Sequence, residues 1–374
     1  MGTEILPDER ALRQGRRARA LAQMHAHDLD VLVLGRQANA RYVAGAPQLW
    51  VAGTRPFGPV ATLVRDTGEV HLLSTWDEGI PEDIPHDNLY GLAWNPLTTL
   101  DVLSRIDGAS TARRVGTDAL SPTFATLLPR AFPQAELVDG EPALAAARRI
   151  KTPEEIATLR TALAAAEAAL ATAVAALAPG VREQSLIGIL LEAMTAGGIS
   201  TPASQDSAWV TSKEHPWQRA GGGRVARAGD LVAFSAGILG DGYIGEVGRT
   251  RPADGTGDDR TRALYQRWDR LWDRLLQACR PGATATGLLT AYELAGEALP
   301  PMPVARGLGM GFDAPVVSPR LPRTAAAERL QPGMVLSVTT YVFEPGVGAV
   351  FGRDAVLITD TGAEVLTTAP HWPH

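Results

Sequence analysis

Cysteine, blocks of one charge and long apolar runs are all scarce in this sequence. Cys279 is the single cysteine among 374 residues, so an internal disulfide framework and a thiolate metal cluster are excluded, as is typical of a reducing compartment. Residues 1–17 are charged and have no apolar run of the kind that forms a signal peptide. The most apolar stretch, residues 161–178, is rich in alanine and carries Glu167. We therefore expect a cytoplasmic protein without a transmembrane segment.

The charged residues argue against two classes of partner. The formal net charge is −6 at pH 7, and the chain contains no block of like charges. An electrostatic footprint for nucleic acid or for an anionic membrane surface is therefore missing, and we expect neither partner. In contrast, 45% of the residues are hydrophobic, which suffices for the buried cores of one large or two ordinary globular domains.

Helix and strand patterns alternate in the first 140 residues. Leu and Ala recur at helical intervals over residues 8–28, and the apolar run VLVLG that follows is typical of a buried strand. The remaining elements expected here are strands at 60–64, 70–73 and 114–116 and helices near 98–106 and 122–131. The pattern predicts an α/β fold for this part of the chain.

A domain boundary is indicated within residues 141–156. Thr152 can cap a helix, Pro153 suits its first turn, and Glu155 stands where the carboxylate of a capping box belongs. A long helix is therefore expected to begin here and to run as far as Pro179.

We therefore expect two domains, residues 1–150 and residues 151–374. In the second, the segments LVAFSAG, DGYIGEVGRT, MVLSVTTYVFEP and DAVLIT alternate with glycine turns, a pattern typical of hairpins in a curved antiparallel sheet. Helices are expected at 183–196, 258–279 and 286–298. The mixture of helices and antiparallel strands predicts an α+β architecture for this domain.

Six segments resemble, in the same order, those of the creatinase, aminopeptidase P and prolidase superfamily. They are RRIKTPEEI at the domain junction, 229-GDLVAFSAG and 242-GYIGEVGRT as a strand pair, then 307-GLGMGFDAP, 330-LQPGMVLSV and 353-RDAVLITDTG. One glycine-rich segment alone would be a weak signal, whereas the ordered set is specific. The resemblance covers nearly the whole chain. It implies a creatinase-like α/β N-terminal domain followed by a domain with the pita-bread fold, built on a curved antiparallel sheet.

The resemblance also identifies positions at which metallopeptidases of this superfamily hold two metal ions, with two Asp, one His and two Glu. That chemistry needs hard ligands that keep a bridging water as hydroxide. In this sequence the same positions are occupied by Ser235, Glu246, Arg306, Thr339 and Arg353. Guanidinium groups repel a dication and do not deprotonate in proteins. We therefore expect no metal and no other cofactor, and a dinuclear aminopeptidase or prolidase is disfavoured.

Creatinase, within the same superfamily, works without metal, using a histidine as acid and base and an arginine from the partner subunit. His215 lies just upstream of the strand where the family carries that histidine; the gap to Gly229 is a few residues longer than usual, so Gln218 is the alternative occupant. Arg55, in TRPFGPV, resembles the creatinase arginine that binds the substrate carboxylate. The resemblance thus implies a homodimer in which Arg55 completes the site of the other protomer.

Each of the other polar candidates has two interpretations. Arg306 and Arg353 can bind a carboxylate or phosphate through their planar guanidinium groups, or pair internally with Glu246 or Asp354. Asp313 can orient a base or an ammonium group, or cap a turn.

Three aromatic residues, Trp209, Trp217 and Tyr341, can wall a small-molecule pocket or belong to the core. Together these considerations give a candidate site. We assign catalytic roles to His215, Glu246 and Asp313, and substrate contacts to Arg306, Arg353, Tyr341 and Arg55.

Three functions are compatible with these residues. The one we favour is a metal-independent creatinase-like enzyme that uses acid/base catalysis on a C–N bond of a small substrate bearing a carboxylate. The second is a metal-free enzyme of specialised metabolism that catalyses a cyclisation, dehydration or isomerisation. The third is a noncatalytic relative that binds a peptide or small molecule. An arginine-lined polar cavity that retains His215 would favour an enzyme, whereas closure of the cavity by an Arg306–Glu246 pair would favour binding.

Overall fold

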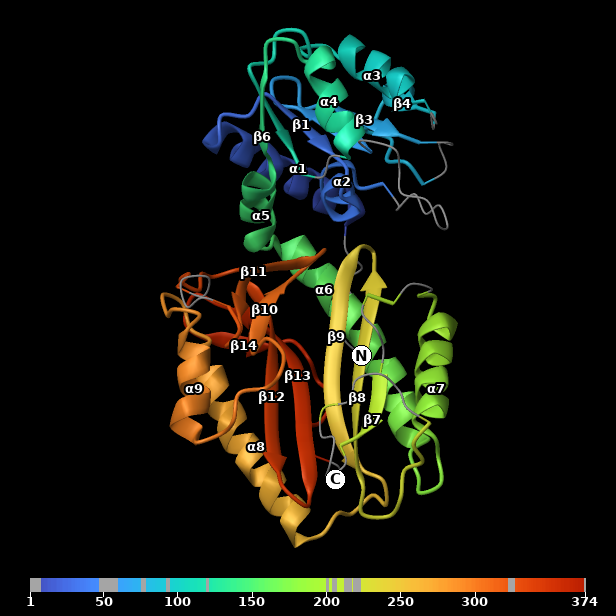
Figure 1. The fold of residues 1–374 in the computed structure, drawn as a ribbon, viewed down its shortest axis with the longest axis vertical. Coiled ribbons are helices and arrows are strands. Elements are labelled where there is room, and N and C mark those ends of the chain that lie inside the picture. Colours follow the sequence, from blue (N-terminus) through green and yellow to red (C-terminus); the bar gives the residue numbers. More distant parts are fainter. Residues whose placement is uncertain are drawn as a thin grey trace. The chain divides into compact units, whose positions relative to one another are not determined.

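The computed structural model describes residues 8–46, 60–74, 79–91, 95–118, 121–199, 202–203, 207–211, 217, 223–321 and 327–372. The chain divides into two compact units, and the division falls between Arg148 and Arg149. The first unit combines helices with a mixed sheet, and the second combines helices with an antiparallel sheet (Figure 1).

The first unit is the α/β domain that the sequence predicts. Its elements are α1 (Glu9–Ala26), β1 (Val31–Leu34), α2 (Gln37–Ala44), β2 (Ala61–Val64), β3 (Val70–Leu73), the 3₁₀ turn η1 (His86–Asn88), β4 (Leu89–Tyr90), α3 (Pro96–Arg105), β5 (Arg114–Thr117), α4 (Pro122–Ala131), β6 (Glu136–Asp139) and α5 (Glu141–Arg149). The six strands are ordered β4-β3-β2-β1-β5-β6, with β2 antiparallel to both of its neighbours and the other pairs parallel. Strand β1 is buried along its whole length, in agreement with its unbroken apolar sequence.

The second unit holds the remaining elements. They are α6 (Pro153–Ala175), α7 (Glu183–Ala196), β7 (Ser207–Val210), β8 (Leu231–Gly240), β9 (Tyr243–Pro252), α8 (Asp259–Ala278), α9 (Gly287–Ala295), β10 (Ala305–Leu308), β11 (Phe312–Val317), β12 (Val335–Glu344), β13 (Gly348–Ile358) and β14 (Ala363–Val365). The sheet order is β11-β10-β12-β13-β9-β8-β7, and β14 pairs with β13. The predicted hairpins are β8–β9 and β12–β13; the first turns at Asp241 and Gly242, which both have positive φ, as a tight two-residue hairpin turn requires.

The helix at the domain junction begins with the capping box that the sequence predicts. The Thr152 hydroxyl accepts from the Glu155 amide at 3.2 Å, and the Glu155 carboxylate accepts from the Thr152 amide at 2.9 Å. Helix α6 ends at Ala175, before the proline that was expected to end it. By length and composition α6 could cross a membrane, but its small side chains pack against β8 and β9: a Cβ on Gly245 would lie 2.3 Å from the Ala162 carbonyl oxygen.

Helices cover one face of the second unit's sheet. The apolar side chains of β8 that point to this face, among them Phe234 and Ile238, pack against α6 and α7. Those of β12 and β13, among them Val338 and Val356, pack against α8 and α9. Figure 1 shows the two hairpins, each with its own pair of helices. We call this helix-covered side the back face; because side chains alternate along a strand, the intervening residues point to the opposite side, the site face.

Candidate functional site

The five positions that the resemblance relates to metal ligands come together on the site face. They are Ser235, Glu246, Arg306, Thr339 and Arg353. Ser235 on β8 pairs with Gly248 on β9, Gly248 pairs with Arg353 on β13, and Arg353 pairs with Thr339 on β12. Residues that pair directly across antiparallel strands point to the same face of the sheet. Glu246 lies two residues before Gly248, and Arg306 pairs with the residue two before Thr339, so both share this face.

The carboxylate of Glu246 is the centre of this group. Glu246 is fully buried, and its Oε2 accepts from Arg306 and, at 3.5 Å, from Nη1 of Arg353. Its other oxygen, Oε1, is buried and has no hydrogen-bond partner among the residues that the structure describes. A buried carboxylate oxygen of this kind is a strong acceptor for a donor that enters the site.

The two arginines hold Glu246 in different ways. The Arg353 side chain is 3% exposed, donates to Ser235 Oγ and Met302 Sδ at 3.3 Å each, and lies 5.3 Å from the centre of the Phe351 ring. The Arg306 side chain is 16% exposed. Arg353 is therefore fixed within the sheet, whereas Arg306 is the cation that a ligand can reach.

Gly248 makes room for Arg353. A Cβ at this position would lie 2.3 Å from the Phe351 ring and 3.0 Å from Cβ of Arg353. Any side chain here would displace the Phe351 ring and press on Cβ of Arg353, so the chain carries glycine where the two hairpins meet.

Asp313, the third predicted catalytic residue, lies on β11 beside a lysine. Its Oδ2 is 3.9 Å from Nζ of Lys151, and both side chains are 2% exposed. Asp313 thus forms an ion pair with an ammonium group of the protein itself. The assignment of Asp313 as a catalytic residue stays a prediction.

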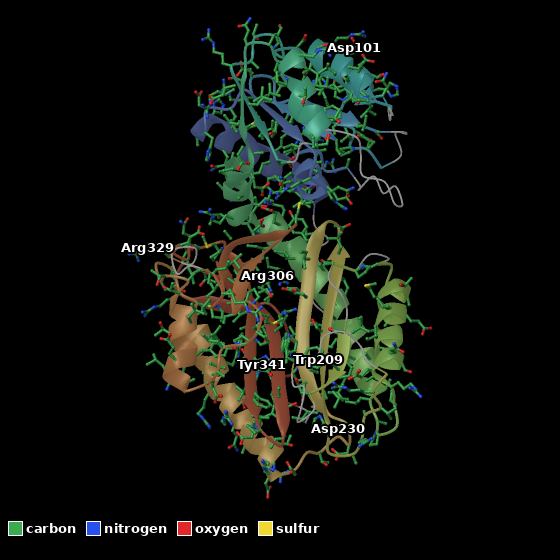
Figure 2. All side chains as sticks on the ribbon, viewed as in Figure 1. Asp101, Trp209, Asp230, Arg306, Arg329 and Tyr341 are labelled. Carbon is green, nitrogen blue, oxygen red and sulfur yellow. The ribbon has the colours of Figure 1, made fainter. Side chains whose placement is uncertain are left out.

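The predicted aromatic residues form one cluster on the site face, next to Arg353. The Trp217 ring packs edge-on against Trp209, Tyr341 and Phe351, with ring centres 5.3–5.7 Å apart. Trp209 and Tyr341 are buried and Trp217 is half-buried. Burial raises the pKa of Tyr341 to about 12, so its hydroxyl stays protonated at neutral pH. In Figure 2, Tyr341 and Trp209 lie farther along the strands than Arg306.

Three sequence predictions lie outside the described residues. They concern His215, its alternative Gln218, and Arg55. Their roles stay predictions.

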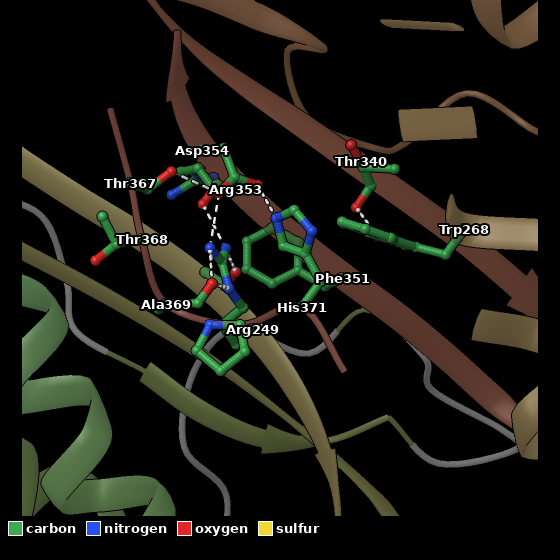
Figure 3. Close-up of polar contacts among 12 residues, drawn as sticks. Arg249, Trp268, Thr340, Phe351, Arg353, Asp354, Thr367, Thr368, Ala369 and His371 are labelled. Carbon is green, nitrogen blue, oxygen red and sulfur yellow. Dashed lines mark hydrogen bonds and ion pairs between the residues drawn. The ribbon is translucent and has the colours of Figure 1, made fainter. Parts of the chain in front are cut away.

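A second group of charged residues, which the sequence reasoning missed, lies behind the site. Asp354 follows Arg353 and points to the back face, where it binds Arg249 and His371, so it is not the counter-ion of Arg306 or Arg353 (Figure 3). Burial opposes its charge, but Arg249, His371 and Thr367 outweigh this and lower the pKa of Asp354 to about 2. His371, in the C-terminal segment, packs against Trp268 and Trp272.

Comparison with known proteins shows where this architecture belongs. The model of metallopeptidase family M24 matches residues 157–360, and that of the creatinase/prolidase N-terminal domain matches residues 16–150. The chain belongs to metallopeptidase family M24. It therefore also belongs to the creatinase/prolidase superfamily that the six sequence segments indicated.

Curated relatives of this M24 chain are named as hydrolases or peptidases. An uncharacterised hydrolase/peptidase of Sinorhizobium fredii is 25% identical over 99% of this chain and 97% of the relative. A putative dipeptidase of Bacillus subtilis is 29% identical over 68% of this chain and 70% of the relative. An Xaa-Pro dipeptidase of Pyrococcus furiosus is 29% identical over 59% and 63%.

Solved structures of the family share the fold. A prolidase from Pyrococcus horikoshii has a TM-score of 0.77 at 17% identity, covering 96% of this chain and 99% of its own. An Xaa-Pro dipeptidase from Bacillus anthracis has a TM-score of 0.76 at 18% identity, covering 96% and 98%. The M24 chain thus has the predicted creatinase-like N-terminal domain and pita-bread C-terminal domain.

The donor atoms of this M24 chain can be compared with what a pair of divalent cations requires. Such a pair needs several anionic oxygen or imidazole ligands. The five positions on the site face supply one carboxylate, two hydroxyls and two guanidinium groups, and the guanidinium groups repel cations. Within the described ranges, no group of three or more His, Cys, Asp or Glu side chains is placed to hold a metal ion. The described residues of the site face therefore do not fit a dinuclear metal site.

Proposed function

We propose that this chain is a metal-independent hydrolase that cleaves a C–N bond of a small substrate bearing a carboxylate. The observation that carries the proposal is Oε1 of buried Glu246, an acceptor without a partner among the described residues that lies beside the guanidinium groups of Arg306 and Arg353. Membership of a peptidase family supports hydrolysis, and the chemistry of the five side chains supports a reaction without metal.

The charge of the site supports an anionic substrate. Two guanidinium groups gather around one carboxylate in a buried place, where electrostatic interactions are strong. Arg306 is the less buried of the two arginines and takes the substrate carboxylate in a charge-assisted contact. Tyr341 and Trp217 bound the same face and contact the apolar part of the substrate.

Acid–base chemistry then needs an acceptor and a proton carrier. Oε1 of Glu246 accepts the N–H of the substrate that lies beside the scissile bond. We assign the proton transfer to His215, because imidazole has the intrinsic pKa for it. His215 takes a proton from water as the water oxygen bonds to carbon, and returns it to nitrogen as the C–N electron pair moves to that nitrogen.

The proposal includes a homodimer. Arg55 of the partner subunit adds a second positive charge at the substrate carboxylate, as the resemblance to creatinase implies. Light scattering at micromolar concentration tests this part, and a monomer would contradict it.

The experiment is a substrate screen on EDTA-treated protein. Guanidino acids, N-acyl amino acids and dipeptides are assayed for binding by calorimetry and for release of an amine or other product. For a substrate found in this way, His215→Ala should lower turnover about 10²- to 10⁴-fold with unchanged affinity, and the rate should follow an ionisation near neutral pH. The control is His25→Ala, on the exposed side of α1. Wild-type turnover in His215→Ala would contradict the mechanism.

A noncatalytic binding protein is the second candidate. The ion pair between Arg306 and Glu246 favours it, because each group already has a charged partner for which a substrate would have to compete. The same screen separates the two functions: ligands that bind without any release of product indicate binding alone.

A further inference from the structure

Arg249 makes an unusual set of contacts on the back face of β9. Its guanidinium donates to the carbonyl oxygens of Gly248 at 2.6 Å, Arg353 at 3.1 Å and Ala369 at 2.7 and 3.0 Å. It also pairs with Asp354 Oδ1 at 2.7 Å, and it is buried. Figure 3 shows these contacts converging on one guanidinium from two strands and the C-terminal segment.

These contacts lie where the two hairpins of the sheet meet. Strands β9 and β13 share a single bridge, the pair of Gly248 and Arg353, beyond which they separate. Carbonyl oxygens at such a divergence lose the partners that a continuous ladder would supply and need other donors. Arg249 supplies them to the two bridge residues themselves.

The bridge also carries the candidate site. The Arg353 side chain leaves it toward Glu246, which lies two residues from Gly248 on β9. The position of one charged group relative to the other therefore depends on how β9 and β13 are held together. Arg249 holds the bridge residues themselves, while the Thr250 hydroxyl joins the strands at Phe351, donating to its carbonyl oxygen at 2.9 Å and accepting from its amide at 2.8 Å.

Arg251 provides a natural comparison two residues along the same strand. It too is largely buried, donates to the carbonyl oxygen of the preceding residue, Thr250, and binds the C-terminal segment at the carbonyl oxygens of Pro370 and His371. Its hydrogen bonds do not include Arg353 or Asp354. Both arginines thus anchor the C-terminal segment, and Arg249 in addition donates to the carbonyl oxygens of the two bridge residues.

We propose that Arg249 is a positioning residue of the candidate site: from the back face it fixes the backbone from which Arg353 projects toward Glu246. The C-terminal segment takes part, since Ala369 and Asp354 hold the Arg249 guanidinium in place. The proposal rests on the proposed function in that it takes Arg353 and Glu246 as parts of the substrate site.

The first test observes Arg353 directly and needs no substrate. In protein labelled with ¹⁵N-arginine, the Arg353 guanidinium signals are identified by their loss in Arg353→Lys, and the exchange of their protons with water is measured. Arg249→Lys keeps a positive charge beside Asp354 but cannot reach all four acceptors. We expect it to speed exchange of the Arg353 protons about tenfold or more, the factor that loss of one charged hydrogen bond produces.

Arg251→Lys is the matched control. It weakens the anchoring of the C-terminal segment in the same way but leaves the bridge intact, so exchange at Arg353 should change less than about twofold, a factor well below that of one hydrogen bond. Arg249→Gln repeats the test with an uncharged donor, so that poor folding of one variant leaves the other to decide. Wild-type exchange at Arg353 in folded Arg249→Lys or Arg249→Gln would overturn the proposal, as would equal effects in the Arg249 and Arg251 variants.

A second measurement applies to any carboxylate ligand from the substrate screen. Arg249→Lys should weaken its binding about tenfold, and Arg251→Lys should not. Unchanged affinity in Arg249→Lys, with affinity lost in Arg353→Lys, would overturn the positioning role. Failure of the screen contradicts the proposed function alone, because the exchange measurement stands without a ligand.

Discussion

Two arginine–carboxylate clusters lie on opposite faces of the same two strands, and they differ in how completely their charges are paired. On the back face, Oδ1 of Asp354 accepts from Arg249 and Thr367, and Oδ2 lies 3.2 Å from His371 Nε2. On the site face, Oε2 of Glu246 accepts hydrogen bonds from both Arg306 and Arg353, whereas Oε1 has no partner among the described residues. Both carboxylate oxygens of Asp354 thus have partners, as expected of a structural ion pair, whereas the site cluster keeps one carboxylate oxygen of Glu246 as an acceptor for a ligand.

Removal of Asp354 should have the largest effect on stability. Asp354→Ala leaves Arg249 buried without its counter-ion, and loss of one partner of a buried ion pair costs about 3–5 kcal/mol. Urea unfolding should show this loss. The control is Glu364→Ala, since Glu364 pairs with Arg160 at the surface, where a pair contributes at most about 1 kcal/mol. Equal effects in the two variants would mean that the back cluster has no special structural role.

Acid should reproduce part of this loss in the wild-type protein. A folded-state pKa of about 2, against an ordinary value of 3.8, means that the charge of Asp354 stabilises the fold fully above about pH 4 and that this contribution disappears as the pH falls toward 2. The contribution is about 2 kcal/mol. Unfolding free energies between pH 5 and pH 2 should therefore fall less steeply in Asp354→Asn than in the wild type. Parallel curves would contradict this.

Much of the architecture can be predicted from local sequence patterns. The two charged clusters show which contacts such patterns do not predict. The capping box at Thr152 and the alternation along β8, β9, β12 and β13 are local signals, and the alternation brings Glu246 and Arg353 to one face. The back cluster depends on contacts between distant parts of the sequence, because His371 packs against Trp268 and Trp272, about a hundred residues earlier in the chain. Short elements such as β4, with two residues, also lack a period long enough to recognise.

Substitution of Arg306 on the site face should affect ligand binding more than stability. Arg306→Ala should lower stability by about 1 kcal/mol or less, because Arg353 still neutralises Glu246 and Arg306 is partly exposed. Binding of a carboxylate ligand, or the Michaelis constant of the substrate, should weaken about 10- to 100-fold, since a charge-assisted contact is lost. A large loss of stability with unchanged binding would make Arg306 a structural residue like Arg249.

The smallest expected effect is that of removing metal. EDTA should leave the melting temperature and any activity unchanged, because the site face offers Glu246 as its carboxylate where two cations need several. Elemental analysis should find no stoichiometric Mn, Co, Zn or Fe. About one such ion per chain, released together with a fall in melting temperature, would show that cations are bound despite the two guanidinium groups.

The order of charged residues along β13 also disfavours a shifted register between β13 and β9. Arg353 and Asp354 are consecutive and point to opposite faces, and β9 offers Glu246 to one face and Arg249 to the other. A slip of one residue in one direction would bring Asp354 against Glu246, and a slip in the other would bring Arg353 against Arg249. Either error buries two like charges together. The charges on the two hairpins, which are joined by a single bridge, thus disfavour a slip of one residue in either direction.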